Sequence, residues 1–313
     1  MRASSFALLA SASAVRLVEW NVYWAALDDA AGRAAITTAL DKQVFTAEFA
    51  AIVEAEGDTP EGKLQSWSAA SKLLSSMTPL TTHSGHETLA LFYDHTAYNS
   101  TYSVGGAFTP GRPWLLSRFE ALSTNAEPLW IMAVHFPHFL DTHISPGASI
   151  ATALDAASKA TGGGLTPKSN LIFMGDFNEF QWEDNPCPKP FYPPDCRAQA
   201  AKRMAPLWNG WLKGTAIDMT INHTTTCCTK WAPKDRHTTS YTEWRFEYDH
   251  VFVSGDLFNI GTPHKAQLIP YTYPGTAAPC ADPACTGEDP PKNVTAKHQG
   301  SWHRGWLVDL FIE

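Results

Sequence analysis

Short runs of apolar residues recur along the chain, and each has roughly the length of a single β-strand. The runs are rich in β-branched and aromatic side chains, which are typical of strands buried on both faces of a sheet. They cover residues 15–24, 49–53, 89–93, 130–134, 171–174, 250–253 and 306–312. The pattern therefore predicts buried strands distributed from one end of the chain to the other.

Alanine-rich stretches with helical spacing lie between some of these runs, over residues 28–40, 63–77, 148–160 and 198–212. Strands and helices that alternate in this way predict a layered α/β fold. No internal repeat or domain boundary interrupts the pattern, and 313 residues can bury one large core. We therefore expect one domain over residues 15–313, with the Pro-, Gly- and Thr-rich segments 181–195 and 270–291 as surface loops.

The run over residues 171–174 leads into Gly175-Asp176-Phe177-Asn178. Residues two apart in an extended chain point to the same side, so the acid Asp176 and the amide Asn178 would share one face. Carboxylate and amide oxygens are the ligands that Mg²⁺ prefers. An Asx turn that closes the strand is the other interpretation of these four residues.

Polar residues also stand at the ends of other predicted strands. Taken singly, each is more often a strand-end cap than a catalytic residue, so the argument depends on their occurring together and in order. They are Asn21 after Leu17-Val18-Glu19-Trp20, Glu54 after residues 49–53, His135 after residues 130–134, Asp249 ahead of residues 250–253, and His303 within Ser301-Trp302-His303-Arg304.

These motifs, in this order, resemble the endonuclease/exonuclease/phosphatase superfamily, the DNase I-like group. The resemblance extends over about residues 15–313. It implies an α/β (α+β) fold, a four-layered α/β-sandwich with two central mixed β-sheets flanked by helices. It also implies a hydrolase acting on phosphoric esters with Mg²⁺ or Mn²⁺ as cofactor.

The resemblance assigns the metal to Glu54 and Asn21. Glu56 is the alternative ligand to Glu54, because it lies two residues further along the same strand face. Arg112 and Arg118 are candidate contacts to the substrate phosphate, although an exposed surface arginine is the plainer interpretation of each.

The resemblance also implies the catalytic roles. Asp249 would orient His303, which takes a proton from the attacking water. Asn178 and His135 would stabilise the transition state. Asp176 would orient the nucleophile or transfer a proton, and the sequence does not separate these two roles.

One residue departs from the family pattern. Trp302 stands where the family has the Asp of its Ser-Asp-His motif, so an acceptor and a negative charge are lost near the metal. Glu56 or Asp309 would have to substitute, or the chain would be a non-catalytic binding protein on the same scaffold. Trp302 could also pack against a base, sugar or lipid portion of a substrate.

Charge bears on the substrate. The chain has 23 basic and 31 acidic residues, a formal net charge of −8, and no basic cluster. This lowers the expectation of tight nucleic-acid binding, but an acidic protein can still cut DNA from a local cationic cleft. We expect a phosphodiesterase or nuclease, with a sphingomyelinase-like lipid phosphodiesterase as the alternative. The partner is thus a phosphate ester of a nucleic acid or a phospholipid head group, bound by a monomer without a transmembrane segment.

Three features together favour secretion over an intracellular location. Residues 1–14 have a positive charge, a short apolar stretch and a small-residue ending, as in a signal peptide, although a disordered N-terminus fits too. Six cysteines lie in loop-like sequence, which suits disulfides whose pairing the sequence does not determine. Three glycosylation sequons begin at Asn99, Asn222 and Asn293.

Overall fold

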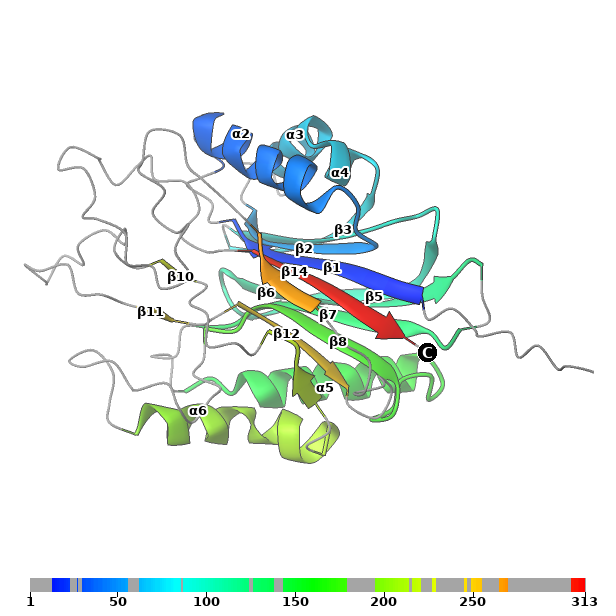
Figure 1. Ribbon diagram of the computed structural model, residues 1–313. Helices are drawn as coiled ribbons and strands as arrows, with labels where there is room; N and C mark the ends of the chain where they lie inside the picture. The colour runs from blue at the N-terminus through cyan, green and yellow to red at the C-terminus, as the bar shows by residue number, and fades with distance from the viewer. Residues whose placement is uncertain are drawn as a thin grey trace, which may run out of the picture.

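The computed structural model carries two β-sheets of six strands each, packed face to face, with helices on both outer faces (Figure 1). It describes residues 13–22, 27, 30–55, 62–85, 87–123, 126–137, 143–178, 195–213, 216–220, 227–228, 245–246, 249–254, 265–269 and 305–312. The two predicted loops fall outside these residues, apart from Asp195.

The first sheet has the strand order β13-β14-β1-β2-β4-β3. Strands β1 and β2 run parallel and the other neighbours run antiparallel, so the sheet is mixed. Its strands are β1 (Ser13–Asn21), β2 (Phe49–Ala55), β3 (Thr78–Ser84), β4 (Glu87–Tyr93), β13 (Lys265–Leu268) and β14 (Trp306–Ile312).

The second sheet has the order β5-β6-β7-β8-β12-β9, and here β7 and β8 are the parallel pair. Its strands are β5 (Tyr98–Thr109), β6 (Arg112–Ala121), β7 (Leu129–His135), β8 (Asn170–Asp176), β9 (Ala216–Asp218) and β12 (Asp249–Ser254). A separate two-stranded ribbon pairs β10 (Cys227–Cys228) with β11 (Arg245–Phe246).

The helices form the two outer layers. In Figure 1, α2 (Ala30–Ala39), α3 (Gly62–Ala70) and α4 (Lys72–Ser75) lie over the first sheet, and α5 (Pro146–Ala160) and α6 (Cys196–Ala205) lie over the second. Two short π-helical segments, η1 (Leu40–Val44) and η2 (Pro206–Trp211), extend α2 and α6. None of the helices in the described part of the chain is long and apolar enough to cross a bilayer.

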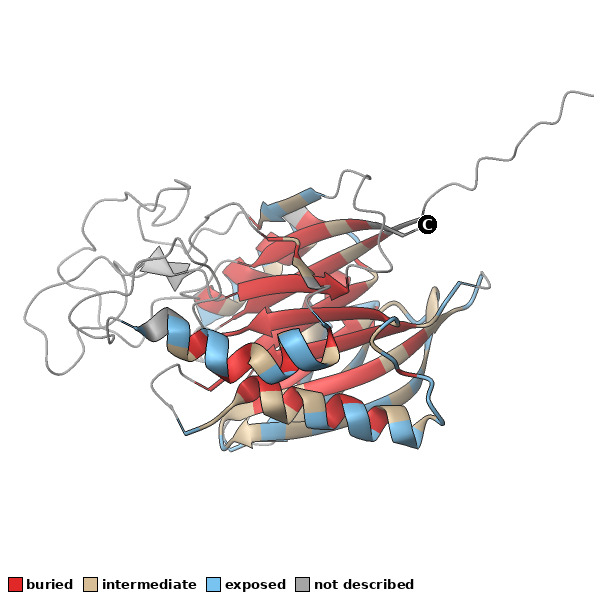
Figure 2. Cartoon of the chain, turned by 90° about the horizontal axis from the view of Figure 1, so that it is seen from below, coloured by how far each residue is buried: buried red, intermediate tan, exposed pale blue. Residues whose placement is uncertain are grey.

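Three apolar clusters hold these layers together, one between the sheets and one beneath each helical layer. The two-residue periodicity of a strand divides its side chains between them. In β1, for example, Val15 and Leu17 face the other sheet, while Val18 and Trp20 face the helices. Figure 2 shows the strands as an almost continuous buried layer beneath helices that are exposed on one side. This two-sided burial explains why most strands appear in the sequence as unbroken apolar runs.

The predicted fold class is confirmed, and every predicted apolar run coincides with a strand, although β1 ends at Asn21, within the first run. The predicted helix over residues 63–77 is two helices, because the side chain of Ser71 accepts a hydrogen bond from Leu74 N and so begins α4. Among the longer strands, β3, β5 and β6 were not predicted. Strands β3 and β5 alternate between half-buried and exposed residues, so neither contains a continuous apolar run.

Candidate active site

Polar side chains from both sheets meet at one edge of the sandwich. Two parallel strand pairs, β1 with β2 and β7 with β8, end at this edge, and the antiparallel strands β4 and β12 begin there. The residues placed at these strand ends are Asn21, Glu54, Glu87, His135, Asp176 and Asp249. Five of these six residues were predicted as site residues from the sequence, and the fold brings them to the same edge. The sixth, Glu87, was not predicted.

Asn21 joins the two sheets across the site. Its amide nitrogen donates to Glu54 Oε1 at 2.9 Å, in its own sheet, and to Asp176 Oδ2 at 2.8 Å, in the other. Both bonds use the amide nitrogen, so the side chain of Asn21 holds the two carboxylates beside its amide group. The arrangement brings two carboxylates and one amide together, which is a donor set suited to a hard divalent cation.

Glu54 reaches the site through an irregularity in β2. Inner-facing residues of β2 are Phe49, Ala51 and Val53, so regular alternation would turn Glu54 toward the helices. Instead the register with β4 shifts between Ile52 and Ala55, and Glu54 adopts φ 58°. Left-handed backbone costs a non-glycine residue about 1–2 kcal/mol and is concentrated at functional sites.

The Gly175-Asp176-Phe177-Asn178 sequence has a steric explanation. Gly175 has φ 142°, and a Cβ atom there would lie 2.0 Å from the carbonyl oxygen of Val134 in β7. Only glycine lets β8 approach β7 this closely beside His135. Asp176 Oδ1 accepts a hydrogen bond from Asn178 N at 2.9 Å, so the Asx turn forms as well. Asn178 adopts φ 45°, and its side-chain amide donates to Phe136 O at 3.2 Å.

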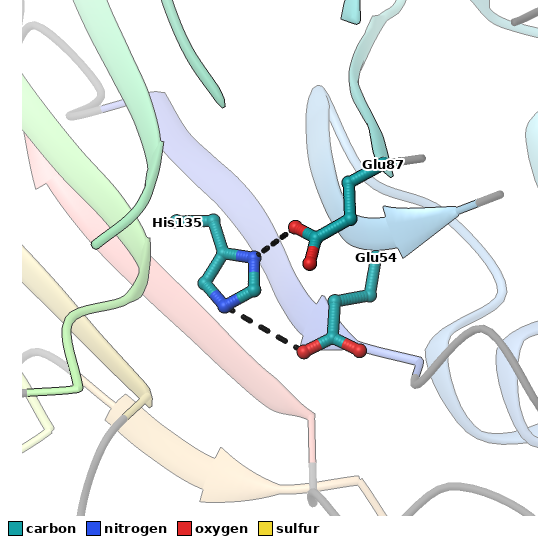
Figure 3. Close-up of side chains that lie close together, drawn as sticks. All are labelled: Glu54, Glu87 and His135. Atoms are coloured by element: carbon teal, nitrogen blue, oxygen red, sulfur yellow. Dashed lines mark hydrogen bonds and ion pairs between the residues drawn. The ribbon is translucent and has the colours of Figure 1, made fainter. Parts of the chain in front are cut away.

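Glu87 was not predicted from the sequence, yet it forms a close contact with His135. Glu87 Oε2 lies 2.6 Å from His135 Nδ1 (Figure 3). Arg112 Nη1 lies 3.2 Å from Glu87 Oε1 and also contacts the imidazole of His135. Burial raises the pKa of Glu87 to about 7, and the charge of Arg112 opposes that rise. The available signal was an acid two residues ahead of the apolar run at residues 89–93.

The residues fit a metal ion. One ligand atom each from Glu54, Glu87 and His135 lie within 4.8 Å of one another, a spacing that a cation bound at about 2.0–2.3 Å from each could bridge. Arg112 already places a positive charge against Glu87 and His135.

Asp249 lies at the site, and its predicted partner does not fall within the described residues. Asp249 is buried, pairs in register with Asp176, and its backbone carbonyl accepts from Trp306 Nε1 at 2.9 Å. His303 and Trp302 lie outside the described residues, as does Glu56. The chain resumes at Gly305, which packs closely on the ring of Trp20 beside Asn21.

The structure places Arg118 and Asp309 away from the site. Arg118 pairs in register with Trp130, and its guanidinium donates to Thr101 Oγ1 at 2.8 Å and to Glu120 Oε1 at 2.5 Å. Five residues of β7 separate that position from His135, about 17 Å along the strand. Of these two candidate arginines, Arg112 is the one that contacts Glu87 and His135.

Asp309 pairs with Arg16 at 2.7 Å, near the opposite end of β1 from Asn21. This contact gives its carboxylate a partner far from Glu54 and Asp176. Asp309 therefore does not replace the acid that the family carries at the position of Trp302.

Comparison with known proteins identifies the fold. Neither a protein-family model nor a curated protein matches the sequence. Among solved structures, zebrafish (D. rerio) TDP2 complexed with a single-stranded DNA product is similar at 14% identity and TM-score 0.56, covering 95% of this chain and 98% of that one.

Two proteins of Bacteroides thetaiotaomicron are similar to the same degree. One is an endonuclease/exonuclease/phosphatase family protein, at 16% identity and TM-score 0.54 over 96% of this chain and 98% of the other. The second is a mannosyl-6-phosphatase, at 15% identity and TM-score 0.56 over 95% and 99%. The chain thus has the DNase I-like fold of the endonuclease/exonuclease/phosphatase proteins, which is the fold that the resemblance of its motifs implies.

Proposed function

We propose that this chain is a metal-dependent phosphoesterase, and that its substrate is a phosphodiester. The observation that carries the proposal is the contact of Asn21 with Glu54 and Asp176 across the two sheets, directly beside the Glu87–His135 pair. Proteins of this fold include the mannosyl-6-phosphatase and DNA-bound TDP2, so the fold alone does not choose between monoesters and diesters.

The geometry supports different roles for the individual residues of the cluster. A Mg²⁺ or Mn²⁺ ion held by Glu54 and Asn21 would offset the negative charge of the phosphoryl group. His135 Nε2 lies 3.6 Å from both Glu54 Oε1 and Asp176 Oδ2, so it faces the same space. Nδ1 is bonded to Glu87 and Nε2 contacts Arg112 Nη1, so the imidazole and the guanidinium together would face a phosphoryl oxygen in that space.

Arg112 supplies a second positive charge on the same side. Its guanidinium is held by Glu87, which fixes its position before substrate binds. A guanidinium held in this way suits an anionic phosphate oxygen. Asp249 and His303 remain the proposed pair that removes a proton from the attacking water, on the basis of the sequence motif and the position of Asp249 opposite Asp176.

The test is hydrolysis of bis(p-nitrophenyl) phosphate and of p-nitrophenyl phosphate by the purified chain, with Mg²⁺, Mn²⁺ or EDTA. We expect diester hydrolysis that EDTA abolishes and that Glu54→Gln reduces at least about 100-fold. Glu120→Gln, which removes an acid at the far end of β6, is the matched control and should keep full activity. Activity that survives both EDTA and Glu54→Gln would contradict the proposal.

A second round would separate the macromolecular substrates. Single-stranded DNA, RNA and sphingomyelin vesicles would be offered under the metal condition that works best. We expect cleavage of a nucleic acid, while cleavage of sphingomyelin alone would select the lipid phosphodiesterase instead. Faster hydrolysis of the monoester than of any diester would contradict the phosphodiester substrate and leave only the proposal of a phosphoesterase.

A further inference from the structure

His250 is a buried side chain that the proposed mechanism does not use. It follows Asp249 in β12, and neighbouring residues of a strand face opposite sides of the sheet. Phe252 faces the helices, whereas Val251 and Val253 face the other sheet. Alternation therefore puts Asp249 on the inner side and His250 behind it, on the helical side. The imidazole is 0% exposed, and a buried titratable group directly behind a proposed catalytic acid calls for an explanation.

A carboxylate of the neighbouring strand β9 binds this imidazole. His250 Nδ1 lies 2.8 Å from Asp218 Oδ2, and neither side chain is exposed. A carboxylate only accepts hydrogen bonds, so Nδ1 donates in this contact. Asp218 Oδ1 accepts from Thr220 N at 2.7 Å and from the Thr220 hydroxyl. Both oxygens of Asp218 are thus occupied, and a charge-assisted bond in a buried site holds its donor in one direction.

The Asp218–His250 pair extends the attachment of β9 to β12 towards Asp249. The ladder between the two strands ends at Phe252 of β12, and a bond from Met219 N to Val251 O at 2.8 Å continues it by one step. The side-chain pair reaches one residue further. On its other side, β12 pairs with β8 from Asp249 onward. The start of β12 is therefore fixed by a backbone ladder on one side and by the side-chain pair on the other.

The same imidazole supports the turn that follows β8. Its ring lies against Phe177 with 5.8 Å between the centroids and an interplanar angle of 81°, an edge-to-face contact that aromatic rings favour. Phe177 is buried and stands between Asp176 and Asn178 in the chain. One buried ring therefore links the strand that begins with Asp249 to the turn that carries Asp176.

Packing alone does not explain a polar pair at this position. The imidazole lies between Phe177 and Phe252, whose ring centroid is 5.3 Å away, so a phenyl ring would fill the same space. Replacing a buried charged pair by apolar side chains of similar volume often leaves stability unchanged or raises it. A hydrogen bond adds direction, because it weakens steeply away from its preferred angle.

We propose that His250 and Asp218 are positioning residues, which hold Asp249 in the orientation that its partner histidine requires. The inference rests on the proposed function, in which Asp249 and His303 remove a proton from the attacking water. The pair acts through Asp249 and, by way of Phe177, on the turn that carries Asp176.

The test compares two variants of His250 in the full chain, with bis(p-nitrophenyl) phosphate and the metal ion that supports the fastest hydrolysis. His250→Phe keeps a ring and removes Nδ1. His250→Asn removes the ring and places its amide nitrogen near the position of Nδ1. We expect kcat to fall at least about tenfold in His250→Phe, with KM within about twofold of the wild type, because the orientation of a base matters in the transition state.

In His250→Asn, kcat should stay within about threefold of the wild type, because the hydrogen bond to Asp218 is kept. A role in packing alone predicts the reverse order, since the phenyl ring fills the space and the asparagine does not. That order, or equal kcat values in all three proteins, would overturn the inference.

Val253→Ala and Ser254→Ala are the matched controls on the same strand. Val253 is buried between the sheets, so its truncation should lower the urea midpoint without changing kcat. Ser254 is buried at the far end of β12, and its hydroxyl has no hydrogen-bond partner among the described residues, so Ser254→Ala should change neither. If Val253→Ala lowers kcat as much as His250→Phe does, the loss comes from a weakened strand and the inference is wrong.

Amide hydrogen exchange measures the positioning without turnover. In His250→Phe, we expect residues 249–251 to exchange at least about fivefold faster than in the wild type, while residues 171–174 of β8 keep their rate. Ser254→Ala should match the wild type in both segments. Equal exchange of residues 249–251 in His250→Phe and the wild type would contradict the positioning role.

Asp218→Asn takes the place of His250→Phe if that variant does not fold. An amide has one oxygen, whereas Asp218 accepts from Thr220 on one side and from His250 on the other. One donor therefore loses its acceptor in either orientation of the amide, and kcat should fall at least about tenfold. An unchanged kcat in Asp218→Asn would overturn the inference.

The two proposals fail in different ways. A wild type that hydrolyses diesters, with the same kcat in His250→Phe, would retain the proposed function and lose the positioning role. A wild type without activity on any phosphate ester would lose the proposed function, and exchange at residues 249–251 would then decide whether the pair holds Asp249.

Discussion

Glu87 Oε2 and His135 Nδ1 lie 2.6 Å apart, although Glu87 belongs to one sheet and His135 to the other. The contact lies at the edge where the strands of both sheets converge, and it fixes which imidazole nitrogen faces Glu54 and Asp176. Relative movement of the two sheets would break it. The pair therefore ties the packing of the sandwich to the orientation of a candidate catalytic group.

If the two residues act as a unit, their substitutions will not be additive. We expect Glu87→Gln to lower kcat by about 10- to 100-fold and His135→Asn by about 100- to 1,000-fold, as for a lost hydrogen-bond donor to the transition state. The double variant should be no worse than His135→Asn alone, because Glu87 acts through the imidazole. Measured kcat values that fall by the product of the two single effects would show independent roles.

The raised pKa of Glu87 predicts a pH dependence of stability. Its pKa rises from an ordinary value of 4.5 to about 7, so between these values the folded chain holds a proton that the unfolded chain has released. Stability is then greatest below pH 4.5 and is lost as the pH rises toward 7, by up to about 3 kcal/mol from this group.

Urea unfolding in EDTA at pH 5 and pH 8 measures this effect, with Glu87→Gln as the reference. Glu19 and Glu48 also have raised pKa values, so both proteins lose stability with pH, and the difference between them isolates Glu87. The wild type should lose more stability than the variant over this interval. Equal losses would mean that Glu87 ionises normally in the folded chain.

The strands that consist of continuous apolar runs, and the polar residues at the ends of those runs, could be predicted from the sequence. Asn21, His135 and Asp176 follow such runs, and the packing of the two sheets brings all three to one edge. Glu87 precedes its run instead of following it, because β4 is antiparallel to β2 and starts at the edge where β2 ends. Strand direction is set by tertiary pairing, so the sequence of β4 alone gave no reason to select its first residue.

Backbone irregularities and the positions of long side chains could also not be predicted from the sequence. The bulge that turns Glu54 toward the site depends on pairing between β2 and β4. Arg112 and Arg118 were equivalent candidates, and only the register of β6 on β7 separates them. The raised pKa of the buried Glu19, caused by burial and then by Asp249 and Asp176, likewise depends on segments that are far apart in the sequence.

Gly175 should be intolerant of any side chain. A Cβ atom would meet the Val134 carbonyl oxygen at 2.0 Å, in a backbone conformation that other residues rarely adopt. We expect Gly175→Ala to lower the free energy of unfolding by about 3 kcal/mol or more. Gly210 has open space around its Cβ position, so Gly210→Ala should change the stability by no more than about 1 kcal/mol. Similar effects in the two variants, measured by urea unfolding, would contradict this steric account.

The secretory interpretation stays a prediction, and one sequon makes it testable. Asn99 is exposed on β5, so a glycan there would extend into solvent. When the chain is produced through a eukaryotic secretory pathway, we expect the intact mass of Asn99→Gln to be lower than that of the wild type by one N-glycan. Enzymatic removal of N-glycans should then leave only the difference between the two side chains. If the masses differ only by the two side chains before that treatment, Asn99 carries no glycan. Six free thiols in the same sample would contradict secretion with disulfides.

Arg112 and Arg118 provide a matched pair of substitutions on one strand. Arg112 contacts Glu87 and His135, whereas Arg118 is bonded to Thr101 and Glu120 at the far end of β6. Arg112→Ala removes the guanidinium that would contact the substrate phosphate, and a charge-assisted hydrogen bond contributes about 1.5–3 kcal/mol. We therefore expect kcat/KM for the diester to fall by about 10- to 150-fold in Arg112→Ala and to change less than about twofold in Arg118→Ala. Comparable losses in both variants would mean that the losses come from weakened strand packing and not from phosphate binding.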